Sequence, residues 1–326
     1  MAKIEEILDI ERIDRDLYRG PAIRTHMQRT FGGQVAGQTL TAAVRTVDAD
    51  KHVHSLHGYF IRPGIPDVPT VFQIDRLRDG RSFATRRVTA IQEGEPIFSM
   101  SASFHQIDQE GIEHQDSMPR VVSPEEIDVP TIDDLADEYK GFAQEWAQWD
   151  IRVVPRDKLE LSPSLASQQR VWFRCVDTLP DDHNFHVCTL AYMSDMTLLD
   201  SAKVPHRDEP IQEASLDHAM WFMRPFRADD WLLYDQTSPS ASAGRALTQG
   251  RIFDRSGRLV AAVTQEALSR TLRPGAQAFP LSTTDDPSPS CDDTITSPPW
   301  LVATWRTIDN PSPVPPVSRL RARSTR

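Results

Sequence analysis

The chain contains 326 residues, 39% of them hydrophobic and 25% charged, which is the composition of an ordinary soluble protein long enough for two modest domains. Its formal net charge of −11 excludes broad nucleic-acid binding, because such binding needs a basic footprint, and no apolar stretch reaches the length of a membrane span. Three cysteines with irregular spacing do not form a disulfide framework, so we expect a reducing compartment.

The first half of the chain opens with a helical pattern. Residues 31–47, FGGQVAGQTLTAAVRTV, predict one long helix. Gly33, Ala36 and Gly37 recur on one face of this helix, and such small side chains permit close packing against another element. About four antiparallel strands are predicted to follow it.

The last strands of this half are marked by a turn and by strict alternation. Gly94, within residues 92–95, can adopt the positive φ that a tight hairpin requires. In the strand that follows, apolar side chains face one way and serines the other, namely Phe98, Met100, Ala102 and Phe104 opposite Ser99, Ser101 and Ser103. This period is that of a half-buried strand.

Residues 109–165 separate the two halves. They are acidic and contain prolines, which indicates a connection between two units rather than a third domain. Within this segment, residues 132–149 predict a short amphipathic helix.

The second half repeats the organisation of the first. Residues 181–199 predict a helix with Asp181 or Asp182 as its N-cap. The phrase Trp221-Phe222-Met223-Arg224-Pro225 then matches Tyr59-Phe60-Ile61-Arg62-Pro63 at a spacing of 162 residues, and Gly257 matches Gly94 at a spacing of 163. Coincidence is the alternative, but duplication of one α+β unit explains the common spacing better.

Residues 271–326 differ from the rest of the chain. They hold ten of the 25 prolines together with many Ser and Thr residues, and they are too poor in apolar side chains to offset the entropy of ordering. We therefore predict a disordered tail. It ends in Ser324-Thr325-Arg326, which is not a peroxisomal targeting tripeptide, so a cytoplasmic location is expected and the peroxisome is the alternative.

Several familiar catalytic signatures are absent from the sequence. It contains no G-x-S-x-G elbow, no Walker loop, no dinucleotide fingerprint and no zinc-binding H-E-x-x-H motif. Cys175 and Cys188 lie among apolar neighbours, which favours buried structural thiols over nucleophiles. We accordingly expect neither a metal nor a cofactor.

Three polar side chains interrupt the pattern of the second half. Gln265 falls among the apolar positions of the last strand, where an unpartnered buried amide costs about 1–3 kcal/mol. Asp195 lies late in the predicted helix, where the helix dipole disfavours a carboxylate, and Ser215 begins the strand of the repeated phrase. A strand end in solvent, a frayed helix terminus and an ordinary strand-initiating serine are the respective alternatives.

The first half carries none of these three groups. The aligned positions fall near Gly33, at Val53 and at Ala102. A carboxylate, a hydroxyl and a carboxamide on three elements of one copy can together hold and polarise one water molecule. This difference between the copies is what draws attention to them.

Several long blocks resemble the type II acyl-CoA thioesterases, which carry two hotdog domains in one chain. The blocks lie within residues 8–270 and include FGGQVAGQTL, HSLHGYFIRPG, RDGRSFATRRVTAIQEGEPIF, YMSDM, SLDHAMWFMRPF and TQEALSR. The resemblance implies an α+β double hotdog, with two antiparallel sheets each wrapped around a long helix to form a pseudo-dimer. The expected divisions are an N-terminal hotdog domain (8–108), an acidic linker (109–165), a C-terminal hotdog domain carrying the catalytic residues (166–270) and the tail (271–326).

The resemblance also implies catalytic roles for Asp195, Ser215 and Gln265. They match the family's Asp in Y-x-S-D, its Thr or Ser before [LI]-D-H and its Gln in the final strand, with Ser where many members have Thr. The implied reaction is hydrolysis of an acyl-CoA thioester to a free acid and coenzyme A by an activated water. It would serve fatty-acyl metabolism or a specialised biosynthetic pathway.

An acyl-CoA substrate is therefore the expected partner, and a homo-oligomer of double-hotdog chains is left open. Four arginines are candidates, by charge alone, for binding the CoA phosphates: Arg78, Arg81, Arg86 and Arg87. Two alternative functions are a hotdog hydratase or dehydratase and a non-catalytic acyl-CoA binding module.

Overall fold

The computed structural model describes residues 2–107, 109–134, 137–207 and 209–271. Its helices are α1 (Ile4–Leu8), α2 (Gly32–Val44), α3 (Asp137–Glu145), α4 (His183–Met193) and α5 (Asp200–Lys203), with short 3-10 turns at Pro124–Glu126, Ile132–Asp134, Arg156–Lys158 and Val204–His206. The strands of the first half are β1 (Glu11–Asp14), β2 (Leu17–Gly20), β3 (Lys51–Phe60), β4 (Thr70–Asp79), β5 (Phe83–Gln92) and β6 (Glu95–Gln106). Those of the second half are β7 (Trp149–Val153), β8 (Gln168–Cys175), β9 (Ile211–Ser215), β10 (Asp217–Phe222), β11 (Leu232–Ser242), β12 (Arg245–Asp254) and β13 (Leu259–Thr271).

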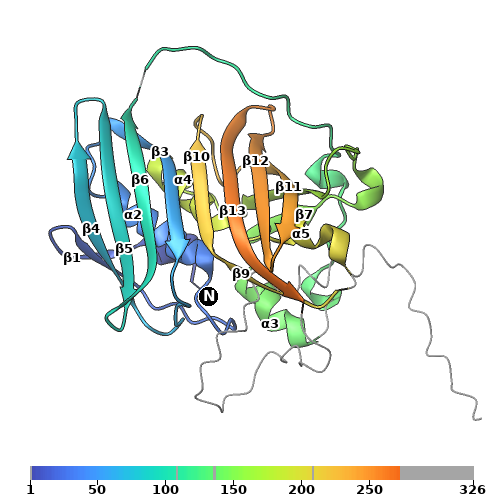
Figure 1. Cartoon of the computed structure of the whole chain (residues 1–326), viewed down its shortest axis with the longest axis horizontal. Coiled ribbons are helices and arrows are strands. Elements are labelled where there is room, and N and C mark those ends of the chain that lie inside the picture. Colours follow the sequence, from blue (N-terminus) through green and yellow to red (C-terminus); the bar gives the residue numbers. More distant parts are fainter. Residues whose placement is uncertain (1, 108, 135–136, 208, 272–326) are drawn as a thin grey trace, which may run out of the picture.

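The strands of the described residues form one continuous antiparallel sheet, in the order β1-β2-β4-β5-β6-β3-β10-β13-β12-β11-β8-β7, with β9 paired to β13 (Figure 1). The prediction of two separate sheets is therefore wrong in this respect. Strands β3 and β10 pair with each other, with Asp217 opposite Tyr59 and Trp221 opposite Ser55. The sheets merge because each repeat would otherwise expose the unpaired N–H and C=O groups of an edge strand at this position.

The order of strands is symmetric about the β3–β10 pair. Reading outward, β6, β5 and β4 on one side correspond to β13, β12 and β11 on the other. The two predicted turns occupy equivalent places, with Gly94 at φ 83° and Gly257 at φ 85°. The alternation predicted for β6 is confirmed as well, because Phe98, Met100 and Phe104 are buried. The duplication of one α+β unit thus accounts for the architecture.

Helices α2 and α4 pack against each other on one side of the sheet (Figure 1). A Cβ atom added to Gly33 would lie 2.2 Å from the backbone oxygen of Tyr192, and one added to Gly37 would lie 3.2 Å from that of Cys188. The small-residue face predicted for the first helix is therefore the face that contacts α4.

The second predicted helix is shorter than expected. Asp182 is its N-cap, accepting a hydrogen bond from the backbone N–H of Asn184 at 2.9 Å, but α4 already ends at Met193. Residues 194–210 then separate α4 from β9, whereas only residues 45–50 separate α2 from β3. Asp195 therefore lies just after its helix rather than late within it. The extra chain length also breaks the uniform repeat spacing. Counted from the ends of the two helices, Thr46 corresponds to Asp195, since each lies two residues beyond its helix, whereas the uniform spacing pointed to Gly33.

The connecting segment contributes to the second half of the sheet. The short helix predicted there is present as α3, and β7, which also lies within residues 109–165, pairs with β8. The tail prediction falls almost wholly on residues 272–326, which lie outside the described residues. The proposed domain boundaries stay predictions.

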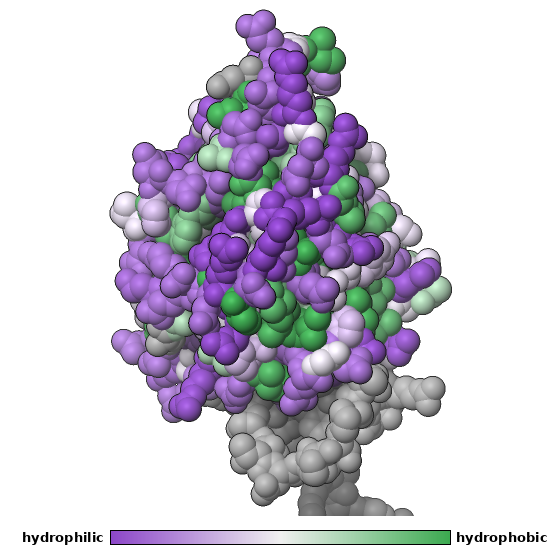
Figure 2. All heavy atoms as spheres, turned by 90° about the vertical axis from the view of Figure 1, so that its left-hand side faces the viewer, coloured by the Kyte–Doolittle hydropathy of each residue, from purple (hydrophilic) through white to green (hydrophobic). Residues whose placement is uncertain are grey.

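The outer strand β1 has four exposed residues in the sequence ERID. Figure 2 shows the side of the molecule at the β1–β4 end, where hydrophilic side chains are interspersed with small hydrophobic patches. Charged side chains on an edge strand discourage pairing with another chain. Among the described residues, no helix is both long and apolar enough to traverse a bilayer.

Candidate active site

Asp195, Ser215 and Gln265 converge although they come from three elements. The Gln265 Nε2 group on β13 donates to Asp195 Oδ1 at 2.7 Å and to Ser215 Oγ at 2.8 Å. The Ser215 hydroxyl, at the end of β9, donates to Asp195 Oδ1 at 3.4 Å. The sequence interpretation that these three groups meet is confirmed as geometry.

Burial controls the protonation of this carboxylate. Asp195 is only 3% exposed, and the loss of hydration raises its pKa to about 6, despite hydrogen bonds from Gln265, the Gly33 backbone and Ser215 that lower it. A carboxylate with a pKa near 6 can both accept a proton at neutral pH and release it again.

The first half of the chain supplies the other wall of the site. The backbone N–H of Gly33, in the first turn of α2, donates to the Asp195 carboxylate, where the positive end of the helix dipole favours negative charge. A Cβ atom on Gly32 would lie 2.6 Å from Asp195 Oδ2 and 3.1 Å from the ring of Phe60. Both glycines are therefore needed for their small size. The sequence analysis identified Gly33 only as a packing residue and did not single out Gly32, because backbone contacts leave no side-chain signature.

The structure excludes one alternative for the predicted site and corrects one detail of it. Gln265 is 0% exposed, so its strand does not reach solvent there. Ser215 ends β9 and pairs with Ala267 of β13, instead of beginning the strand of the repeated phrase. That strand, β10, starts at Asp217, whose carboxylate accepts from the Glu266 backbone N–H at 2.6 Å. The bend at residue 216 lets Ser215 and β10 lie beside the same strand.

His218 is a buried residue of the site region that sequence reasoning did not assign to it. Its Nε2 atom lies 2.8 Å from Ser194 Oγ, and Ser194 directly precedes Asp195. The Ser194 backbone oxygen in turn accepts from the Tyr234 hydroxyl at 3.2 Å. The repeat carried a signal for this residue, since the position 162 residues earlier is Leu56, an apolar side chain.

A second polar cluster lies between α5 and β9. Lys203 Nζ is 2.8 Å from Asp200 Oδ1 and 2.9 Å from Glu213 Oε2, and both carboxylates are buried. The cluster connects the turn that follows Asp195 to the strand that ends in Ser215. It therefore helps to hold two elements of the site at a fixed separation.

The remaining sequence candidates lie elsewhere. Arg86 is only 1% exposed and donates to Thr46 Oγ1 at 2.8 Å, so the interpretation of this arginine as a phosphate ligand is wrong. Arg87 pairs with Asp75 on the outer face of the sheet. Cys175 and Cys188 are buried free thiols, and burial raises their pKa values to about 11 and about 12. No group of metal-ligating side chains occurs within the part of the chain that the structure describes.

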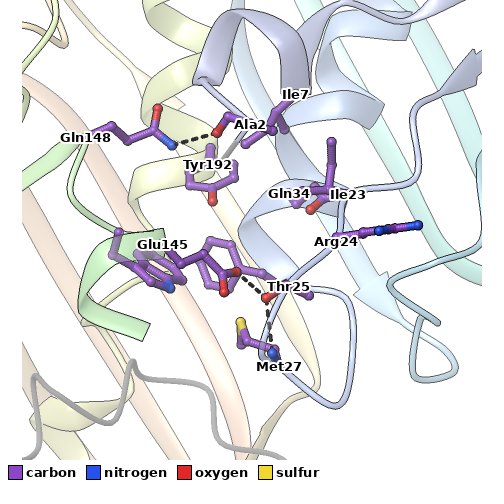
Figure 3. Close-up of a pocket in the computed structure, with 12 residues that line it drawn as sticks. Ala2, Ile7, Ile23, Arg24, Thr25, Met27, Gln34, Glu145, Gln148 and Tyr192 are labelled. Carbon is purple, nitrogen blue, oxygen red and sulfur yellow. Dashed lines mark hydrogen bonds between the residues drawn. The ribbon is translucent and has the colours of Figure 1, made fainter. Parts of the chain in front are cut away.

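A surface pocket lies beside the start of α2 and the end of α4. It holds about 440 Å³ of empty space, part of it open to solvent, and Phe31, Trp146 and Tyr192 contribute aromatic walls. Figure 3 shows the Glu145 carboxylate accepting a hydrogen bond from Thr25 at its rim. None of the three converging residues lines this pocket, although Tyr192 precedes Asp195 by one helical turn.

Comparisons with known proteins match both halves of the chain. A family profile described as "Acyl-CoA thioesterase N-terminal domain" matches residues 22–105, and one described as "Acyl-CoA thioesterase" matches residues 142–268. The chain is 39% identical over 285 residues to "Acyl-coenzyme A thioesterase 8" of Homo sapiens, covering 82% of this chain and 88% of that protein. It is 34% identical over 277 residues to "Acyl-CoA thioesterase 2" of Haemophilus influenzae, covering 81% and 96%.

A solved structure shows the same arrangement. The acyl-CoA thioesterase II TesB2 from Mycobacterium marinum is 56% identical, with a TM-score of 0.74 over 83% of this chain and 100% of that chain. An α+β hotdog fold in two domains, matched in both halves, defines the class as hotdog-type thioesterases. Within that class, the chain belongs to the type II acyl-CoA thioesterase family.

Proposed function

We propose that this protein hydrolyses acyl-CoA thioesters with a water molecule activated by Asp195, Ser215 and Gln265. The observation that carries the proposal is the hydrogen-bonded cluster of these three side chains, in which Asp195 and Gln265 are buried and Asp195 is the acid. Family membership supplies the substrate class.

In this mechanism Asp195 is the general base. With a pKa near 6 the carboxylate is ionised at neutral pH and accepts a proton from the attacking water. The water attacks the thioester carbonyl carbon, the C–S bond breaks, and the leaving thiolate of coenzyme A takes up the proton that Asp195 accepted, which restores the carboxylate. The products are a carboxylic acid and coenzyme A.

Ser215 and Gln265 orient the reacting groups. Each makes a hydrogen bond to Asp195 Oδ1, which fixes the direction of the carboxylate and leaves Oδ2 beside Gly32. Thiolates leave readily, so the proposed reaction requires no covalent nucleophile. The buried, unreactive state of Cys175 and Cys188 is consistent with that reading.

The two alternative functions receive less support. A hydratase would use a histidine facing the substrate, but the Nε2 atom of His218 is bonded to Ser194 Oγ at 2.8 Å. A silent binding module would have no need to bury an ionisable carboxylate at the cost of its hydration. The acyl-chain length, the pathway, the cytoplasmic location with the peroxisome as alternative, and any homo-oligomer stay predictions.

Thiol release from a series of acyl-CoA substrates tests the proposal. We expect the wild-type protein to release thiol, and Asp195→Asn to lose at least about 100-fold in kcat because it lacks the general base. In the wild type, kcat should rise with pH through about 6, as the pKa of Asp195 requires. Equal kcat values for the wild type and Asp195→Asn would remove Asp195 from its proposed role.

A further inference from the structure

His218 on β10 lies opposite Gln265 on β13 inside the protein. The antiparallel register pairs Ala219 with Thr264, so the next pair along the two strands is His218 and Gln265. Both side chains are 0% exposed. Directly opposed residues on one face of a sheet have Cβ atoms roughly 4.5–5.5 Å apart, which lets their polar groups meet.

Each of these side chains has one polar atom left over. His218 Nδ1 and Gln265 Oε1 are both buried, and neither has a hydrogen-bond partner in the part of the chain that the structure describes. A ring N–H and an amide oxygen are complementary, and pairing them would satisfy two buried atoms at once. The contact between the two side chains also raises the pKa of His218, against a larger lowering by burial.

The orientation of the Gln265 amide follows from its other partners. Its Nε2 group faces Asp195 Oδ1 at 2.7 Å, and an ionised carboxylate can only accept hydrogen bonds. A reversed amide would place an oxygen against that carboxylate. The NH₂ group therefore faces Asp195 and Ser215, and Oε1 faces the other way.

The tautomer of His218 depends on its two partners. Burial lowers its pKa to about 4, so the ring is neutral at pH 7 and carries one proton. Ser194 Oγ lies 2.8 Å from Nε2, but also 3.0 Å from the Ala191 backbone oxygen and 3.3 Å from Met220 Sδ, so its one proton has three possible acceptors. The amide oxygen of Gln265 can only accept, so a bond between it and Nδ1 requires the ring proton on Nδ1, which makes Nε2 the acceptor of the Ser194 hydroxyl.

We propose that His218 is a positioning residue which, as the Nδ1–H tautomer, donates to Gln265 Oε1 and holds the carboxamide with its NH₂ group toward Asp195 and Ser215. The proposal rests on the proposed function of those three residues. It extends the site to a chain of side chains that begins at Ser194, the neighbour of Asp195. The first repeat has Leu56 at the aligned position, so this support exists only in the second copy.

Other titratable groups near Asp195 are neutral in the working range. Tyr192 on α4 and Tyr234 on β11 are buried, and burial raises the pKa of each phenol above its usual value. The pKa of Asp195 therefore depends on its hydration and on its hydrogen bonds, of which that from Gln265 opposes the effect of burial most strongly.

Four variants distinguish a role of His218 in positioning Gln265 from a role in packing alone. His218→Asn places an N–H group near the position of Nδ1, whereas His218→Gln reaches toward Ser194 without that donor, and His218→Leu copies the first repeat. His186→Leu is the matched control, because His186 is another buried histidine of the same half that bonds only to the Ala228 backbone N–H at 3.1 Å.

The experiment measures kcat and KM for thiol release from a fatty acyl-CoA as a function of pH. We expect His218→Leu and His218→Gln to lose about 10–100-fold in kcat with KM nearly unchanged, the range seen when an outer supporting hydrogen bond is removed. Their acid limb should move to higher pH, because a misplaced Gln265 no longer lowers the pKa of Asp195. His218→Asn should recover most of the kcat, and His186→Leu should change stability alone.

Equal kcat values and unchanged pH profiles in the His218 and His186 variants, beside an inactive Asp195→Asn, would overturn this inference while leaving the proposed function intact. Nitrogen-15 NMR of the imidazole rings gives a readout without substrate, the His218 signals being assigned by their loss in His218→Leu. An Nδ1–H tautomer is expected. An Nε2–H tautomer would refute the proposal even if the protein hydrolysed no acyl-CoA.

Discussion

Gly32 occupies a place where a methyl group would collide with the reacting carboxylate. In Gly32→Ala the new Cβ would lie 2.6 Å from Asp195 Oδ2, so the carboxylate must move by about 1 Å and lose its alignment with Gln265. A displacement of that size costs on the order of 100-fold in rate. We expect kcat for thiol release to fall by about that factor while KM changes little.

Gly111→Ala is the control for this substitution, because a Cβ there meets nothing within 4 Å. It should leave kcat within about twofold of the wild type. An active Gly32→Ala would mean that the position of Oδ2 is unimportant, and the proposed geometry of water activation would have to be abandoned.

The buried carboxylate of Asp195 should lower the free energy of unfolding of the wild-type protein at neutral pH. Its pKa is raised from 3.8 to about 6 in the folded state, so the folded protein binds this proton more tightly than the unfolded chain does. The resulting contribution to the free energy of unfolding is complete below pH 3.8 and is lost as pH rises through 6. At 1.36 kcal/mol per pKa unit, the loss above pH 7 is roughly 3 kcal/mol. We expect Asp195→Asn to be more stable than the wild type at pH 8, and the difference to shrink toward pH 4, in urea unfolding.

At the scale of elements, the Lys203 cluster connects α5 to β9. In Lys203→Met the carboxylates of Asp200 and Glu213 would remain buried without the charge of Lys203 Nζ, which should lower the free energy of unfolding by about 2–3 kcal/mol at pH 8. Burial raises the pKa of Glu213 to about 7, so at pH 5 this side chain is protonated and the loss should be smaller.

Lys140→Met provides the comparison, since Lys140 forms an ion pair with the exposed Asp137. Exposed pairs of this kind contribute little to stability, because water screens them. Denaturant midpoints at the two pH values measure both variants. A Lys203→Met protein with the same loss at pH 5 and pH 8 would show that the carboxylates do not control the effect.

The elements illustrate what can be predicted from a sequence alone. Strand periodicity and turn glycines report local geometry, so β6 and the Gly94 and Gly257 turns were predicted correctly. The length of α4 was not, because the polar residues that end it at Met193 bond to distant strands, as Ser194 does to His218. The merging of the two sheets also escaped prediction, since the pairing of β3 with β10 is a contact between edges and leaves no local pattern.

The part of the site that could be predicted consists of polar side chains whose aligned positions in the first repeat hold apolar or small residues. Asp195 and Gln265 stood out against apolar or small residues in the first copy, and they do meet. The Gly33 backbone N–H could not be foreseen, because any residue type carries one. Arg86 was misread since a buried arginine and a phosphate-binding arginine look alike until their partners are known.

At the scale of the whole molecule, the place corresponding to Asp195 in the first half holds a structural contact. Thr46 accepts from the buried guanidinium of Arg86 through its Oγ1 atom, at 2.8 Å. Thr46→Val should leave Arg86 Nε unsatisfied and cost about 1–3 kcal/mol in unfolding free energy, while kcat stays within about twofold. A fall in kcat like that of Asp195→Asn would instead show that the first half takes part in the chemistry.

The pairing of β3 with β10 inside one polypeptide also bears on how such a molecule can change over generations. When two identical subunits associate, every inherited substitution appears on both sides of the axis, and a change that helps one side is imposed on the other. Here the two units are encoded separately, so Leu56 and His218 have been free to diverge across the same junction. The first unit can therefore accumulate substitutions that leave it with a supporting role. A substitution that changes the acyl preference of one unit does not have to be tolerated in the other unit.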